Sequence, residues 1–346
     1  MVEGQAPGKL LLTGEYAVLR GAPAVALAMG GPARARVSQA VAGEFRDAQG
    51  DQTWPYSLGQ GDGVHWHAGD PGQAGRLPAA VLAECLRRWP TPLQSQPLAL
   101  ELDTSAFRRL DADGAPLKFG LGSSAALVVA LTGAVVSALN IDATPAQLRD
   151  CCLDAHRAFQ GGQGSGVDVL TALQGGLLLM ADSVSRPVPI GWPADLHLVT
   201  VWTGHSASTP ALIKQFDVFA QQHAQAFADC LAQLVTAAHE AAGAWRSGVS
   251  GKILAAVQNY ADALRALDVQ GDIGIWTREH ETLADLAASN GAIYKSSGAG
   301  GGDLGYALSD SAEAAAALTE AMTTAGFHVL PATPQAVAGL VVTTEA

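Results

Sequence analysis

The chain has 346 residues, of which 49% are hydrophobic and 15% are charged, so it can bury a core in each of two domains. This balance excludes a generally disordered protein. The formal net charge of -12 argues against a nucleic-acid-binding scaffold or a protein held on an anionic membrane, but it allows a small anionic ligand in a locally basic site.

The four cysteines, Cys85, Cys151, Cys152 and Cys230, form no C-x-x-C pair. In a chain of this size they predict buried, reduced thiols rather than a disulfide framework or a zinc site. The N-terminal stretch has no signal-like apolar core, and the longest apolar run, residues 125–139, is too short to span a bilayer. We therefore expect a soluble cytoplasmic protein, and periodicity leaves a homodimer open.

The first half of the chain is predicted to alternate strands, helices and turns. Thr144 followed by Pro145 is typical of a capped helix start, and this helix is expected to end near Phe159. Before it, in chain order, we expect strands at residues 9–13 and 24–29, hairpins and loops over 43–76, a helix over 77–89, a strand at 98–102, a turn at 111–114 and a buried helix over 125–139.

The second half is predicted to be richer in helices. A run containing Pro and Gly, residues 186–193, suggests a boundary, which we place so that the domains are 1–188 and 189–346. The overall prediction is a mixed α/β fold in two lobes. In this half we expect strands at 177–180 and 196–202, a mostly helical region over 210–290, a helix over 312–325 and a strand at 339–343.

The stretch KFGLGSSAA, residues 118–126, places two glycines and two serines before the predicted buried helix. Bare N–H groups at a helix N-terminus bind phosphate, and glycine allows its close approach. A serine that only caps the helix explains the stretch equally well. No Gly-Lys pair is followed by Ser or Thr, which excludes a Walker A loop. The stretch matches the dinucleotide fingerprint G-x-G-x-x-A, but no second strand follows the helix, so the match is weak.

Two further glycine-rich runs and one strand carry charged residues. In GQGSGVDVL, Asp168 is suited either to orienting or deprotonating an acceptor or to capping the next helix. The run KSSGAGGGD, residues 295–303, predicts either a flexible loop or a close approach to a ligand. Lys9, in APGKLLLTGEYAVL, is either a surface lysine or a bridge between a carboxylate and a phosphoryl group.

Taken together, APGKLLLTGEYAVL, FGLGSSAAL and KSSGAGGGDLGYAL resemble, in order, the three motifs of the GHMP family of small-molecule kinases. The resemblance spans nearly the whole chain. It implies a two-lobed fold with an N-terminal α/β domain like ribosomal S5 domain 2 and a C-terminal ferredoxin-like domain. Within the family, GEY in the first motif, HRAFQGGQGSGVDVLTALQGG and VWTGHSAST resemble the phosphomevalonate kinase branch, which implies mevalonate 5-phosphate as the acceptor.

The resemblance also implies ATP and Mg²⁺ and assigns roles to residues. It makes Lys9 and Asp168 the catalytic pair, and Ser124 a Mg²⁺ ligand, because the helix before Asp168 lacks the glutamate that some relatives use. It places the phosphates of ATP on Lys118, Gly120, Leu121, Gly122, Ser123, Ser124, Ala125 and Ala126. Our own hypothesis for the acceptor site consists of Lys9, Glu15, Tyr16, Ser165, Gly166, Asp168, His205, Ser206, Ser208, Lys295, Ser296, Ser297, Gly298, Ala299 and Gly300.

Lys9, Lys118 and Lys295 each flank a glycine motif, although the chain has only 20 Lys and Arg residues. A phosphate acceptor that approaches ATP meets a repulsion of several kcal/mol even at an effective dielectric of about 20, and such lysines offset it. A phosphate monoester is mostly dianionic at pH 7 and hardly needs a base. These points favour an anionic acceptor. A hydroxyl acceptor such as mevalonate, a nicotinamide-dependent oxidoreductase and a non-catalytic ligand-binding relative remain alternatives.

Overall fold

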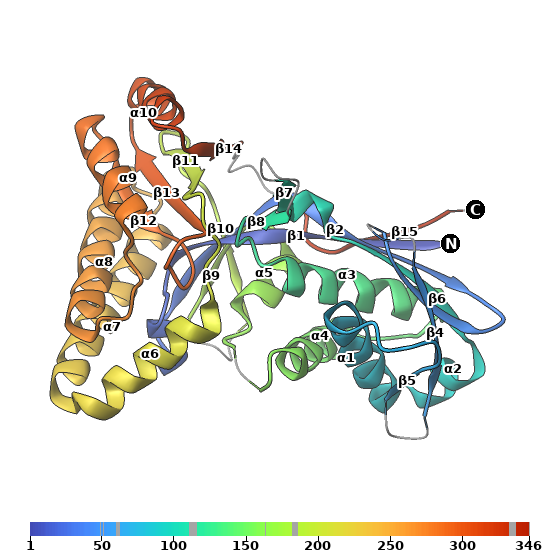
Figure 1. Cartoon of the computed structure of the whole chain (residues 1–346). Coiled ribbons are helices and arrows are strands. Elements are labelled where there is room, and N and C mark those ends of the chain that lie inside the picture. The colour runs from blue at the N-terminus through green and yellow to red at the C-terminus, as the bar shows by residue number, and fades with distance from the viewer. Residues whose placement is uncertain are drawn as a thin grey trace.

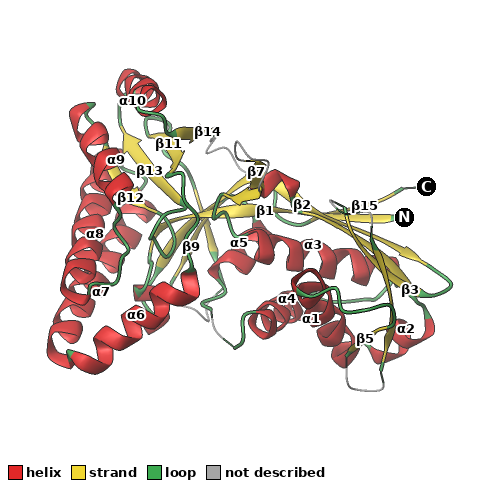
Figure 2. Ribbon diagram, viewed as in Figure 1, coloured by secondary structure: helices red, strands yellow, loops and turns green. Residues whose placement is uncertain are grey.

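Two sheets and the helices packed on them make up the molecule, as Figures 1 and 2 show. The computed structural model describes all residues except 49, 51, 60–62, 111–115, 163, 182–185, 332–336 and 346. Within the described residues, the larger sheet has nine strands and the smaller one four. The predicted turn at 111–114 lies outside the described residues. Short elements outside both sheets are the hairpin β7 (Arg108–Leu110) and β8 (Pro116–Lys118), and the 3₁₀ turns η1 (Ala17–Arg20) and η2 (Ser105–Phe107).

The larger sheet is built on two long strands that pair antiparallel, β1 (Val2–Thr13) and β2 (Ala24–Gln39). The sheet runs in the order β10-β9-β2-β6-β3-β4-β5, and β1 pairs with both β2 and β15. Its other strands are β3 (Gly43–Asp47), β4 (Thr53–Leu58), β5 (Val64–Trp66), β6 (Leu98–Asp103), β9 (Leu177–Met180), β10 (Val188–Ile190) and β15 (Val341–Thr344).

Both long strands extend beyond the predicted segments 9–13 and 24–29. In β2 the predicted segment ends at residues 30–32, Gly-Gly-Pro, because glycine and proline commonly interrupt a strand. In the structure Gly8 pairs with Met29 and Ala6 with Ala33, so this triplet forms a bulge inside β2. A bulge accommodates glycine and proline without ending the strand, because pairing resumes on its far side.

Helices cover one face of the larger sheet (Figure 1). The predicted buried helix is confirmed as α3 (Ser123–Ala138), which packs on β1 and β2 and whose residues 125–135 are all buried. The predicted capped start of α4 (Pro145–Phe159) is also confirmed. The hydroxyl oxygen of Thr144 accepts a hydrogen bond from the N–H of Gln147, and the side-chain oxygen of Gln147 accepts one from the N–H of Thr144. The other helices of this half are α1 (Gln73–Arg88), α2 (Pro90–Ser95) and α5 (Val167–Gln174).

The smaller sheet and a layer of long helices form the other end of the molecule (Figure 2). Its strands lie in the order β12-β13-β11-β14, and Leu283 of α9 and Leu318 of α10 belong to one buried cluster against it. The mostly helical region predicted at 210–290 is confirmed. The elements are β11 (His197–Trp202), α6 (Thr209–Gln222), α7 (Ala224–Ser247), α8 (Ser250–Gly271), α9 (Arg278–Ser289), β12 (Ile293–Ser296), β13 (Leu304–Ser309), α10 (Ala312–Thr324) and β14 (His328–Leu330).

The chain crosses between the two halves more than once. The predicted boundary after residue 188 falls inside β10, which pairs with β9, and the C-terminal strand β15 returns to pair with β1 of the larger sheet. The division into 1–188 and 189–346 stays a prediction. No helix among the described residues has the length and apolar character needed to cross a membrane.

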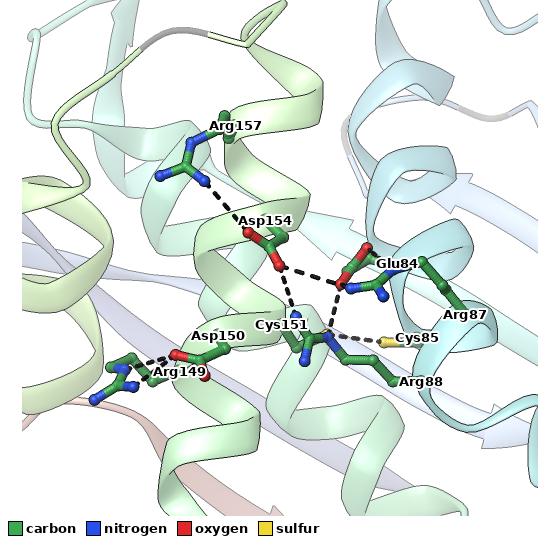
Figure 3. A network of polar contacts seen from close by, with 9 residues as sticks. All are labelled: Glu84, Cys85, Arg87, Arg88, Arg149, Asp150, Cys151, Asp154 and Arg157. Carbon is green, nitrogen blue, oxygen red and sulfur yellow. Dashed lines mark hydrogen bonds and ion pairs between the residues drawn. The ribbon is translucent and has the colours of Figure 1, made fainter. Parts of the chain in front are cut away.

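All four cysteines are buried and free, as predicted. Cys85 and Cys151 lie on the facing helices α1 and α4, with their sulfur atoms 3.8 Å apart. Figure 3 shows the ion pairs beside them, in which Arg88 contacts Glu84 and Asp154, each at 2.7 Å. Burial raises the pKa of the Cys152 thiol well above its ordinary value. Such thiols stay protonated and pack as apolar groups, which explains their place in the core.

His280 of α9 is a buried polar residue with a predictable effect on stability. It is fully buried, its Nδ1 lies 2.7 Å from the hydroxyl of Tyr294, and burial lowers its pKa from an ordinary 6.5 to about 4. The unfolded chain binds a proton at His280 more readily than the folded chain does. The contribution of the neutral, buried imidazole to stability is therefore complete above pH 6.5 and is lost as the pH falls toward 4. The free energy of unfolding should decrease by about 3 kcal/mol over that window.

Urea denaturation at several pH values between 4 and 7.5 tests this expectation. His280→Phe removes the titrating group and should flatten the pH dependence, whatever its effect at pH 7.5. His239→Phe, at an exposed position on α7, is the matched control and should leave the pH dependence unchanged. Equal pH slopes for the parent and His280→Phe would show that His280 does not drive the acid loss.

Candidate active site

The three glycine-rich motifs meet around Lys9 of β1. The N–H of Lys9 on β1 donates to the carbonyl of Leu121 (2.8 Å). A Cβ placed on Gly122 would lie 3.6 Å from Cγ of Lys9 and 3.6 Å from Cβ of Asp168. A Cβ placed on Gly298 would lie 3.6 Å from Nζ of Lys9. The structure therefore brings Lys9, Asp168 and the loops that begin with residues 118 and 295 to one place.

The loop at residues 118–122 leads into α3 without a side-chain cap. Gly122 occupies the N-cap position with a φ of 75°, a left-handed conformation that glycine adopts readily, and no side-chain hydrogen bond caps the helix. The reading of Ser123 or Ser124 as a capping residue is therefore wrong. The first backbone N–H groups of α3 have no partner within the helix and are oriented to bind an anion.

The hydroxyl of Ser124 has a partner from another helix. Its Oγ lies 3.2 Å from Nε2 of His156, which is only 3% exposed on α4. His156 was not among the predicted site residues, since one histidine on a helix gives no signal that it faces a loop 32 residues earlier. The contact fixes the Ser124 side chain at the start of α3.

Asp168 lies in the first turn of α5, after Gly166 at the N-cap. Its own Oδ1 accepts a hydrogen bond from the N–H of Val169 at 3.1 Å. Because the N-cap position belongs to Gly166, Asp168 is not the capping residue that one reading of the sequence allowed. Ser165 is nearby, with its Oγ 3.5 Å from the N–H of Val167. Asp168 and Lys9 flank the same glycine, since a Cβ placed on Gly122 would lie 3.6 Å from Cβ of Asp168 and 3.6 Å from Cγ of Lys9.

Lys295 lies beneath the third loop rather than at its surface. It is fully buried, its Nζ lies 2.5 Å from Oε1 of Glu15, and it donates to the carbonyl of Ser296 at 2.6 Å. The rings of Tyr260 and Tyr306 face the ammonium group at 5.5 and 5.6 Å. Burial lowers the pKa of Lys295, and the carboxylate of Glu15 opposes that change. The charge of Lys295 is thus balanced inside the protein, unlike the ligand-facing cation that the sequence predicted.

Other residues predicted to bind the acceptor also support this loop. Glu15 accepts a hydrogen bond from the N–H of Gly298 (3.3 Å), and the hydroxyl of Tyr16 donates to the carbonyl of Ala299 (2.6 Å). Ser297 bonds both backbone groups of Leu11, at 3.0 and 2.9 Å. These contacts join the first motif to the third and fix the shape of the loop beside Lys9.

The segment at residues 203–208 borders the site from the other half of the molecule. Ser206 donates from Oγ to the carbonyl of Lys118 at 3.2 Å. Ser208 occupies the N-cap position of α6, but its side chain makes no capping hydrogen bond. His205 is exposed, with its Nε2 3.8 Å from Oε1 of Glu279. The side chain of Ser208 therefore does not cap α6.

The structure also excludes the interpretation of the glycine loop as a dinucleotide fingerprint. The strand before the glycine loop, β8, pairs only with β7, in an antiparallel hairpin, among the described residues. A dinucleotide fingerprint requires a βαβ unit of parallel strands around the loop. The match to G-x-G-x-x-A is therefore accidental.

Comparison with known proteins agrees with this geometry. The model of the GHMP kinases N terminal domain matches residues 82–176. The phosphomevalonate kinase of Streptomyces sp. (strain CL190) is 32% identical, with 95% of this chain and 96% of that protein aligned. The mevalonate kinase of Thermococcus sibiricus is 26% identical over 89% of each chain.

The fold has solved counterparts. The Streptococcus pneumoniae phosphomevalonate kinase, in complex with phosphomevalonate and AMPPNP, superposes with a TM-score of 0.77 at 20% identity, covering 96% of this chain and 98% of that one. This likeness confirms the predicted two-lobed α/β fold. The identity and coverage of the Streptomyces relative confirm the resemblance of the three motifs, and the chain belongs to the GHMP kinases, a family of ATP-dependent small-molecule kinases.

Proposed function

We propose that this protein transfers the γ-phosphoryl group of ATP to mevalonate 5-phosphate, giving mevalonate 5-diphosphate and ADP in isoprenoid biosynthesis. The observation that carries the proposal is the 32% identity to a phosphomevalonate kinase over 95% of the chain. The meeting of Lys9, Asp168 and three glycine loops supports it, because phosphoryl transfer depends mainly on positioning and charge stabilisation.

The free backbone N–H groups at the start of α3 are suited to binding the phosphates of ATP. Gly120, Gly122 and Ser123 belong to this stretch of backbone. Lys9 extends from β1 toward the third loop, where it would neutralise charge on the transferred group. An oxygen of the acceptor phosphate forms the new bond to the γ-phosphorus as the bond to the departing ADP breaks. Since that oxygen is already anionic, Asp168 would orient Lys9 and the acceptor rather than act as a strong base.

The residues present fit a magnesium ion held mainly by the nucleotide. Among the described residues, no group of three His, Cys, Asp or Glu side chains could hold a metal by itself. Mg²⁺ commonly binds through one or two protein oxygens, substrate phosphates and waters. Ser124 and Asp168 would supply those oxygens here, and the ion would offset charge between the two substrates. A cytoplasmic location and a homodimer stay predictions.

The proposed acceptor pocket is based on the hydrogen bonds and ion pairs described above. We place the acceptor between Asp168, the backbone of Gly298–Gly300 and the polar side chains of Ser206 and Ser208. Lys9 and Lys118 would balance its phosphate. Glu15, Tyr16, Lys295, Ser296 and Ser297 would act from beneath the third loop by fixing its shape.

A coupled assay of ADP release with mevalonate 5-phosphate and mevalonate at matched concentrations tests the proposal. We expect kcat/KM to be at least about 10²-fold higher for the phosphorylated acceptor, because Lys9 and Lys118 lose a charged partner when mevalonate is the acceptor. Mevalonate is the second candidate, favoured by the 26% identity to a mevalonate kinase. A higher kcat/KM on mevalonate would refute the first choice. Protein carrying Lys9→Met, prepared in the same way, controls for contaminating kinases.

A further inference from the structure

Asp303 ends the third glycine run, directly before β13, and has no role in the site as described so far. Its φ of 53° lies in the left-handed region that residues other than glycine rarely adopt. Its N–H donates to the carbonyl of His205 at 2.7 Å, and its carbonyl accepts from the N–H of Thr203 at 2.9 Å and from Oγ1 of Thr203 at 3.1 Å. Its Oδ1 accepts from the N–H of Ala207 at 3.2 Å. Segment 203–207 therefore fixes both the backbone and the carboxylate.

The fixed carboxylate lies against the loop that leads into α3. Gly120 in that loop has a φ of 76°, and a Cβ placed on it would lie 2.6 Å from Cβ of Asp303 and 2.8 Å from Oδ2. The same 203–207 segment also holds the start of this loop, since Ser206 bonds the carbonyl of Lys118. Asp303 is thus a junction between the second motif, the third motif and segment 203–207.

Burial, the largest influence, raises the pKa of Asp303, although the N–H of Ala207 and the positive charges of Lys9 and Lys118 oppose this change. A partly buried carboxylate beside a phosphate-binding loop is unfavourable unless fixed donors and cations compensate it. Here the donor and the cations compensate burial only in part, and the hydrogen bonds from segment 203–207 hold the carboxylate in place.

We propose that Asp303 keeps a fixed negative charge against the loop that leads into α3 and so limits how tightly the site binds anions. The inference rests on the proposed function, because it concerns how that site handles phosphate groups. Without the carboxylate, the lysines would attract free phosphates more strongly in the ground state. Tighter ground-state binding does not raise kcat, and it slows the release of ADP.

Asp303→Asn tests the inference, because it keeps the size and an oxygen for Ala207 while removing the charge. We expect pyrophosphate, measured by isothermal titration calorimetry without metal, to bind about fivefold more tightly or better, since a like charge is removed from the site. We expect kcat with ATP and the acceptor to fall about tenfold. Asp310→Asn, at an exposed position just after β13, is the matched control and should change neither quantity.

If the role of Asp303 were purely structural, the affinity for pyrophosphate would change in the opposite direction. Asp303→Asn would then weaken pyrophosphate binding and lower the thermal midpoint, and either that result or an unchanged affinity overturns the inference. Pyrophosphate binding does not involve the acceptor, so lack of activity on mevalonate 5-phosphate would refute the proposed function and leave this test intact.

Discussion

Replacing Lys9 by methionine is expected to lower kcat by about 10³-fold, the size of effect seen when one fixed donor to developing charge is removed. The side chain of Lys9 passes Gly122 and Asp168, and its Nζ lies beside Gly298 of the third loop. It is therefore the cation in contact with all three motifs. Methionine keeps nearly the same length, so the loops should remain in place and the thermal midpoint should change little. Steady-state ADP release at saturating ATP and acceptor measures the effect.

The matched control is Lys214→Met, at an exposed position on α6. It removes the same charge from the whole protein but not from the site, and kcat should be unchanged. Retention of more than about a tenth of kcat by Lys9→Met would contradict a role for this ammonium group in the transition state.

Replacing Lys295 by methionine is expected to lower the free energy of unfolding by about 3–5 kcal/mol, because it leaves the buried carboxylate of Glu15 without its cation. Both side chains are almost completely buried, with exposed fractions of 0% and 1%. Glu15 Oε1 also accepts the N–H of Gly298, so an unpaired Glu15 would disturb the third loop as well. Urea denaturation at pH 7.5 measures the loss, and the KM values should rise because the loop beside Lys9 shifts.

Two further variants separate the lost pair from a general effect of the substitution. Lys252→Met, at an exposed position on α8, should leave stability unchanged. The double variant Glu15→Gln with Lys295→Met removes both charges and should recover part of the loss, since no buried charge remains uncompensated. If the double variant were no more stable than Lys295→Met alone, packing rather than charge would explain the loss.

The environment predicted for Lys295 differs most from the one in the structure. A lysine before a glycine run in a chain poor in basic residues suggests a cation for phosphate. The sequence contains Glu15 as well, but the two residues are 280 positions apart, and only the folded chain places them 2.5 Å from each other. Counting charges along the sequence therefore overestimates the positive charge free for a ligand by one.

Asp303 and His156 show the converse, since both were missed. The carboxylate of Asp303 follows a glycine run and reads as a turn residue, and its importance depends on hydrogen bonds from segment 203–207 nearly 100 residues earlier. The imidazole of His156 faces Ser124 only because α3 and α4 pack together. No local spacing encodes either contact.

The sequence by itself determined which segments are glycine-rich loops, which helix is buried, where α4 begins, and which family the chain resembles. These features follow from local backbone preference and from hydrophobic periodicity, which act within one or two turns of chain. The tertiary structure alone decided that the three loops meet at Lys9, that Lys295 is neutralised by Glu15, and that Gly-Gly-Pro at residues 30–32 bends a strand instead of ending it. The reason is that burial, charge pairing and strand register depend on partners distant in the chain, which only packing brings together.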